Sequence, residues 1–103
     1  MNKTSYSIFL DYKKALKDAE LIEHAAKKTM KEASRIVDNC NAVSAAWKGE
    51  NAEKLKEKLL RMEEKLKKTA KQLHKTAQVV RTIAEATYKS EKAALELAKK
   101  RNV

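Results

Sequence analysis

Residues 46–52 of this chain read Ala46-Trp47-Lys48-Gly49-Glu50-Asn51-Ala52, and they contain its only glycine. The stretch lies near the midpoint of 103 residues that include no proline. Glycine adopts positive φ at low steric cost, and helices frequently end at such a residue. Glu50 and Glu53 follow, and acidic side chains stabilise the first turn of a helix. The stretch therefore predicts a turn at 46–51 that joins two helices.

Uncharged residues recur on both sides of this turn in steps that alternate between three and four. Before the turn they are Tyr12, Ala15, Ala19, Ile22, Ala26, Thr29, Ala33, Ile36, Cys40, Val43 and Trp47. After the turn they are Ala52, Leu55, Leu59, Met62, Leu66, Thr69, Leu73, Thr76, Val80, Ile83, Thr87, Ser90, Ala94 and Leu97. A repeat of 3.5 residues is typical of helices that pack along a seam. We therefore predict an all-α fold with one domain over 1–103, an antiparallel hairpin of helices at about 7–45 and about 52–99.

The composition excludes most other classes of protein. β-Sheet and Rossmann folds of this size need many tight turns, which depend on Gly, Pro, Asn and Asp, and a single glycine excludes a Gly-rich phosphate loop. Glu63 and Glu64 are adjacent, so they point about 100° apart on a helix and do not form a catalytic carboxylate pair. The sequence predicts no enzymatic activity and no cofactor.

The net charge of +10 raises the question of an acidic partner, such as nucleic acid or a membrane surface. Arginine, which recognises phosphate through its forked guanidinium, occurs four times, whereas lysine occurs twenty times. Aromatic residues that stack on bases make up 5% of the chain. These features argue against nucleic acid, although a small basic coiled-coil protein that binds nucleic acid or another acidic partner remains the alternative. No apolar run approaches the ~20 residues of a transmembrane helix.

A second apolar set lies beside the first stripe, at Phe9, Leu16, Met30 and Val37. Alanine dominates the first stripe and leucine the second, so we expect the two helices to pack closely, small side chains against large ones. The flanking set then stays exposed on a lone hairpin, and exposed apolar patches mark interaction surfaces. We therefore predict that the hairpin pairs with a second copy or with a related helical chain into a four-helix bundle.

The tripeptide Trp47-Lys48-Gly49, between two helices of similar length in a chain of about one hundred residues, resembles the W-x-G turn of the WXG100 family. The resemblance implies a non-enzymatic role in type VII secretion, with a secretion ATPase as a partner. It implies either a dimeric secreted substrate or an accessory factor that binds the N-terminal helical region of a larger effector. It also implies a cytoplasmic location before export, without a cleaved signal peptide. Trp47 then either seals the turn or docks to the secretion machinery.

Family members carry an export signal, Y-x-x-x-D/E, on or after the second helix. Tyr88 is the tyrosine of that region, but the family spacing places Lys92 where an acid is expected, and the nearest acid is Glu91. Residues three apart on a helix are neighbours, so the pair is either a displaced export signal or a surface aromatic beside an acid. We expect both side chains to project from the same side of the helix edge, partly exposed and without a structural role.

Three further residues are candidates for other chemistry. His24 and His74 lie on opposite arms at similar heights, near Glu20 and Glu23, but a metal site needs a further converging ligand, so we predict solvated side chains and no metal. Cys40 occupies a seam position, where a thiol behaves as a small hydrophobic group. A reactive or interchain thiol is the alternative.

Overall fold

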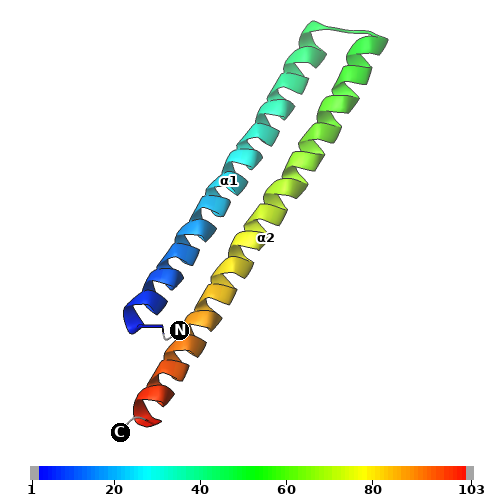
Figure 1. Cartoon of the computed structure of the whole chain (residues 1–103). Coiled ribbons are helices and arrows are strands. Elements are labelled where there is room, and N and C mark those ends of the chain that lie inside the picture. Colours follow the sequence, from blue (N-terminus) through cyan, green and yellow to red (C-terminus); the bar gives the residue numbers. More distant parts are fainter. Residues whose placement is uncertain (1–2, 102–103) are drawn as a thin grey trace. The chain divides into compact units, whose positions relative to one another are not determined.

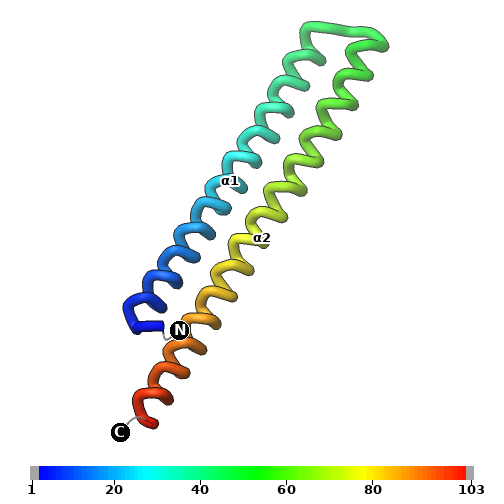
Figure 2. Tube along the Cα trace, viewed as in Figure 1, coloured from blue at the N-terminus to red at the C-terminus, as the bar shows by residue number. Residues whose placement is uncertain are grey.

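The computed structural model describes residues 3–101, which form two α-helices (Figure 1). α1 spans Ser5–Ala46 and has 42 residues. α2 spans Glu50–Arg101 and has 52 residues. The Cα trace reverses direction at the short connection between them (Figure 2). The predicted all-α hairpin is confirmed.

Two compact units share these helices. The turn unit consists of residues 23–74, which are the second half of α1, the turn and the first half of α2. The terminal unit contains the described residues 3–22 and 75–101, which are the start of α1 and the end of α2. Each unit therefore contains its own pair of helical segments, and each is described below on its own.

α1 begins at Ser5 rather than at about 7, because Thr4 caps it. The Ser7 amide donates to Thr4 Oγ1 at 3.0 Å, and the Thr4 amide donates to Ser7 Oγ at 3.0 Å. This reciprocal pair is a capping box, in which serine replaces the usual Glu or Gln at the third helical position. The main-chain bond from Ile8 N to Thr4 O, at 3.0 Å, then starts the helical ladder.

The turn is shorter than the predicted 46–51, because α1 continues to Ala46 and α2 already begins at Glu50. Gly49 has a φ of 125°, as its role in a turn requires. Its carbonyl accepts a hydrogen bond from the Glu53 amide at 3.1 Å, which makes Gly49 the N-cap of α2 rather than the residue that ends α1. α2 also ends later than the predicted position of about 99, at Arg101.

Replacing Gly49 with valine is expected to lower the free energy of unfolding by roughly 1 kcal/mol or more, because a β-branched residue rarely adopts positive φ. A Cβ at this position meets no atom within 4 Å, so the cost comes from the backbone and not from a clash. Urea denaturation followed by circular dichroism measures the change. Lys48→Val is the matched control, since no described non-glycine residue has positive φ. Equal stability of the two variants would show that Gly49 does not need this conformation.

The buried core consists mainly of alanine. Its residues are Ile8, Ala19, Ala26, Ala33, Cys40, Ala52, Ala70, Ala77 and Ala84. Small side chains at a helix contact allow the axes to approach closely. A buried methyl group contributes only about 0.8 kcal/mol of hydrophobic free energy, so this core stabilises each unit modestly. The larger apolar side chains, apart from Ile8, keep part of their surface in solvent.

The predicted first stripe is confirmed along α1. Ala19, Ala26, Ala33 and Cys40 are buried at seven-residue intervals, and the positions between them are half-buried. Trp47 is the exception, because it follows the last residue of α1 and is 49% exposed.

The predicted second stripe is wrong at every other position from Met62 to Ile83, and at every position from Thr87 to Leu97, because these residues are exposed. Glu63 faces inward instead of Met62, and Ala70, Ala77 and Ala84 follow it at intervals of seven as buried residues. Met62 is 52% exposed. The Glu63 side chain is 13% exposed, and its carboxylate pairs with Lys67 on the next turn. A stripe restricted to uncharged residues therefore does not include Glu63. The expected packing of small against large is therefore replaced, from Ala70 to Ala84, by an alanine face on α2.

Candidate functional site

The turn exposes Trp47 beside Gly49. The Trp47 amide continues the helical pattern by donating to the Val43 carbonyl at 2.8 Å. Half of the Trp47 surface is accessible to solvent, so the indole does not seal the turn completely. A large, partly exposed aromatic side chain next to a fixed turn is suited to contact another protein.

The terminal unit holds an aromatic stack that joins its two helical segments. The rings of Tyr12 on α1 and Tyr88 on α2 lie 4.5 Å apart at their centroids, with an interplanar angle of 22°. Lys92 Nζ lies 5.3 Å from the centroid of the Tyr88 ring, within the range of a cation–π contact. Tyr88 is half-buried. It therefore contributes to packing as well as to the surface.

Glu91 is held by an ion pair in the same unit. Lys3 Nζ lies 2.8 Å from the Glu91 carboxylate and 3.6 Å from the Asp11 carboxylate. The hydrogen bond and the negative charge of Glu91 raise the pKa of Lys3 above its usual value of 10.5. Because its pKa is raised, the contribution of Lys3 to stability is fully present below the ordinary lysine pKa and is lost as the pH rises through the raised pKa of Lys3.

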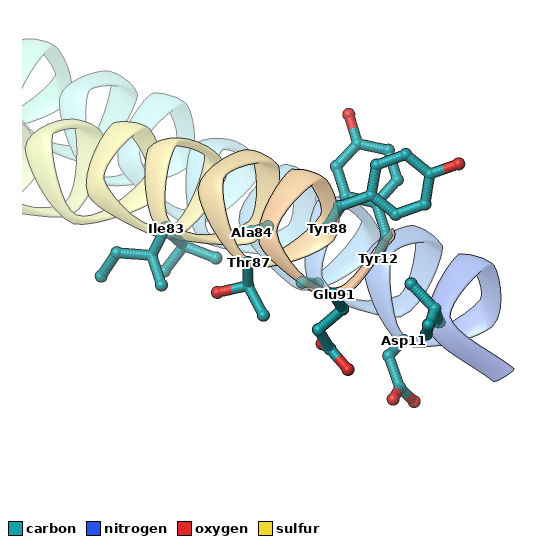
Figure 3. A pocket seen from close by; sticks show the side chains of 10 residues that line it. Asp11, Tyr12, Ile83, Ala84, Thr87, Tyr88 and Glu91 are labelled. Carbon is teal, nitrogen blue, oxygen red and sulfur yellow. The ribbon is translucent and has the colours of Figure 1, made fainter. Parts of the chain in front are cut away.

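A shallow groove of about 260 Å³ opens between the two helical segments of this unit. Ile8, Val80 and Ile83 contribute apolar surface to it, and Asp11, Thr87 and Glu91 contribute polar atoms. Ile83, Thr87, Glu91 and Asp11 project from one edge of the helix pair, whereas the stacked tyrosine rings stand on the other edge (Figure 3). The groove thus has an apolar wall and an acidic end.

The predicted export pair is placed differently from expectation. Tyr88 and Glu91 project from different edges of the helix pair (Figure 3), and each contacts a residue from the start of the chain. The expectation that both lie on one side without a structural role is therefore wrong. The physical reason is the N-terminal segment, which brings Lys3 and Tyr12 against the end of α2. Their function in export stays a prediction.

The predicted partner flank is only partly exposed. Phe9 and Met30 are 41% and 38% exposed, and Leu16 and Val37 are half-buried. Larger exposed fractions occur on α2, where Ile83 and Leu97 are 60% and 57% exposed. These residues belong to the predicted second stripe, which was expected to be buried within the hairpin. The terminal unit therefore exposes large side chains on both helices, because Tyr6 and Leu21 of α1 are 70% and 62% exposed.

The two histidines do not converge on a metal site. Nδ1 of His74 lies 2.6 Å and 2.8 Å from the two carboxylate oxygens of Glu23, a contact between the helices of the turn unit. No group of three or more His, Cys, Asp or Glu suited to a metal ion occurs among residues 3–101. Cys40 is buried, with 2% of its surface exposed, and occupies the seam as expected.

Sequence reasoning missed two features of the terminal unit. The sequence pattern places Tyr12 on the seam but does not by itself pair it with Tyr88. A hairpin centred on the turn brings the two residues to similar heights, and this similar distance from the turn is the signal that could have predicted their contact. The Lys3–Glu91 pair had no comparable signal, because Lys3 precedes the helix and the path of the chain there depends on the Thr4 cap.

Comparison with protein-family models, with curated proteins and with solved structures finds no match to this chain. Within the part of the chain that the structure describes, neither helix is long and apolar enough to cross a membrane.

Proposed function

We propose that this chain is a WXG100-like protein that acts, without catalysis, in a type VII secretion system. It pairs with a second helical chain and serves either as a dimeric secreted substrate or as an accessory partner of a larger effector. It is cytoplasmic before export and needs no cleaved signal peptide. Its other partner is the secretion ATPase.

The observation that carries this proposal is the geometry of the turn. The chain's single glycine adopts a φ of 125° two residues after an exposed tryptophan, between two long helices. This arrangement matches what the W-x-G resemblance implies for residues 47–49. A tripeptide of this kind occurs by chance in many proteins, but here it forms the connection of a hairpin.

The need for a partner is supported by the surface and the core. The chain exposes 8307 Å², whereas a compact monomeric protein of this mass exposes about 5,900 Å². The difference exceeds the roughly 800 Å² that each partner buries in a standard interface. Because the buried core consists mainly of alanine, association would supply apolar burial that the hairpin lacks.

The test is a secretion assay in the native host with the type VII ATPase inactivated. We expect this chain, or a larger effector that depends on it, to disappear from the culture medium and to accumulate in cells. Immunoblots of both fractions measure the change, with an abundant cytoplasmic protein as the control for lysis.

A different result would favour the alternative suggested by the net charge of +10. Export that is independent of the ATPase, for this chain and for any effector, would contradict the proposal. Retention on DNA at physiological salt, lost steeply as salt is added, would then indicate a nucleic-acid-binding coiled coil.

A further inference from the structure

The outer face of α2 in the turn unit carries a straight row of basic side chains. Positively charged residues recur along this face in steps of four and three, and no acidic residue interrupts the row at these positions. We call this row the basic ridge, and its members are Lys54, Lys58, Arg61, Lys65 and Lys68. Because an α-helix rises by about 1.5 Å per residue, the ridge is about 21 Å long.

The basic ridge points away from the packing face of α2. Arg61, at its centre, lies nine residues from Ala52 and nine residues from Ala70, which are both buried. Nine residues make about two and a half turns of an α-helix, so Arg61 faces the opposite side of the helix. All five residues of the ridge are exposed. The ridge is therefore accessible along its whole length.

Most of the charge of the basic ridge is not neutralised within the chain. Lys58, Lys65 and Lys68 form no ion pair with any residue that the structure describes. The other two members each approach a glutamate on the preceding turn, at 3.7 and 3.6 Å. Exposed pairs of this kind contribute little to stability, so an anion with several charges can replace the glutamates.

The chemistry of the basic ridge fits phosphate groups rather than bases or lipid tails. Four of its five members are lysine, which binds phosphate as a point charge and needs no fixed geometry. α2 contains no Phe, Trp or Tyr from Glu50 to Thr87, so no such ring beside the ridge can stack on a base. The ridge also includes no apolar side chain that could enter a lipid layer. A linear chain of phosphates without bases has the complementary charge and shape.

We propose that the basic ridge binds a linear, base-free polymer of phosphates, such as inorganic polyphosphate. Neighbouring phosphates of this polymer share a bridging oxygen, so each ridge residue meets a phosphate whatever the register. Binding releases the counterions that are condensed on the polymer, and this release supplies the affinity. The binding is a second activity of the chain, independent of the export role proposed above.

The test is the anisotropy of end-labelled inorganic polyphosphate titrated with the full chain. For the unchanged chain, the logarithm of the Kd is expected to rise linearly with the logarithm of the salt concentration. The triple variant Lys58→Gln, Lys65→Gln, Lys68→Gln is expected to raise the Kd about 100-fold at about 0.1 M salt, since each lost contact gives up about 0.7 of a released counterion. Glutamine is about as good a helix former as lysine, so circular dichroism should show an unchanged fold.

The matched control removes the same charge from exposed lysines of α1 in the same unit, as Lys27→Gln, Lys28→Gln, Lys31→Gln. The control is expected to leave the Kd within about threefold, because the ridge faces away from the packing face and salt screens charges beyond about 10 Å. Equal losses of affinity in the two triple variants would attribute binding to net charge and overturn the ridge. A Kd that the ridge variant leaves unchanged would overturn it as well.

Single-stranded DNA with the same number of phosphates tests whether the polymer is base-free. We expect DNA to bind more weakly than polyphosphate, because a sugar separates its phosphates and lowers the density of charge along the strand. Ridge-dependent binding of DNA that is tighter than that of polyphosphate would overturn the assignment and indicate a nucleic-acid surface. Export in the native host is a separate readout, so failure of either proposal leaves the other standing.

Discussion

Replacing Ala77 with leucine is expected to lower the free energy of unfolding by about 1–3 kcal/mol, because the larger side chain overpacks the seam. Ala77 has no exposed surface, and Ala70 and Ala84 are buried one heptad before and after it on the same face. Helices that meet at alanines leave no room for an isobutyl group unless their axes move apart. Such a movement would also loosen the contacts of neighbouring seam residues.

Chemical denaturation followed by circular dichroism measures this effect, and Ala86→Leu is the matched control. Ala86 is an exposed alanine of the same helix, and leucine is nearly as good a helix former as alanine. The control should therefore change stability by no more than about 0.5 kcal/mol. If Ala77→Leu is as stable as the control, the alanine face of α2 does not pack against α1.

Replacing Tyr88 with alanine is expected to reduce export about tenfold or more, the change produced by losing about 1.4 kcal/mol of recognition energy. This prediction treats Tyr88 and Glu91 as a displaced form of the family signal. The stack with Tyr12 complicates the test, since the variant also loses an aromatic pair worth about 0.5–1.5 kcal/mol of stability. A fall in export alone would not separate recognition from unfolding.

The variant Tyr12→Ala distinguishes loss of recognition from loss of stability, because it removes the same stack and leaves the Tyr88 ring in place. Lys3→Ala serves in the same way for Glu91→Ala, since it removes the ion pair from the other partner. With intracellular amounts matched, export should fall in the Tyr88 and Glu91 variants and persist in the Tyr12 and Lys3 variants. Equal losses in both sets would assign the effect to stability. Lys92→Glu, which restores the family spacing, should preserve export.

The hairpin could be predicted from the sequence because its determinants are local. A single glycine interrupts two stretches rich in Ala, Leu, Lys and Glu, and helix propensity and a positive-φ turn depend on the residues at hand. The alanines of α1 could also be placed, because Ala19, Ala26, Ala33 and Cys40 repeat strictly by seven. The side chains on that face of α1 are therefore much smaller than those on its other faces.

The packing face of α2 was decided by tertiary structure. The uncharged residues of α2 cover more of the helix surface than one seam needs. Two neighbouring faces could therefore pack against α1, one that contains Met62 and Ile83 and one that contains Glu63 and Ala77. The second face packs inward because alanines allow the helices to approach closely, and because Lys67 pairs with Glu63. Glu63 is charged and lies on the face that packs inward. A pattern restricted to uncharged residues therefore did not identify that face.

The same reason explains what the sequence predicted about the candidate sites. The turn that contains Trp47 and Gly49 was located correctly, since a turn depends on neighbours in the chain, whereas Trp47 was wrongly placed on the first stripe. The surroundings of Tyr88 and Glu91 were not, because their contacts with Tyr12 and Lys3 join residues far apart in the sequence. Those contacts depend on the register of the two helices and on where Thr4 starts α1, and both are settled only when the helices pack.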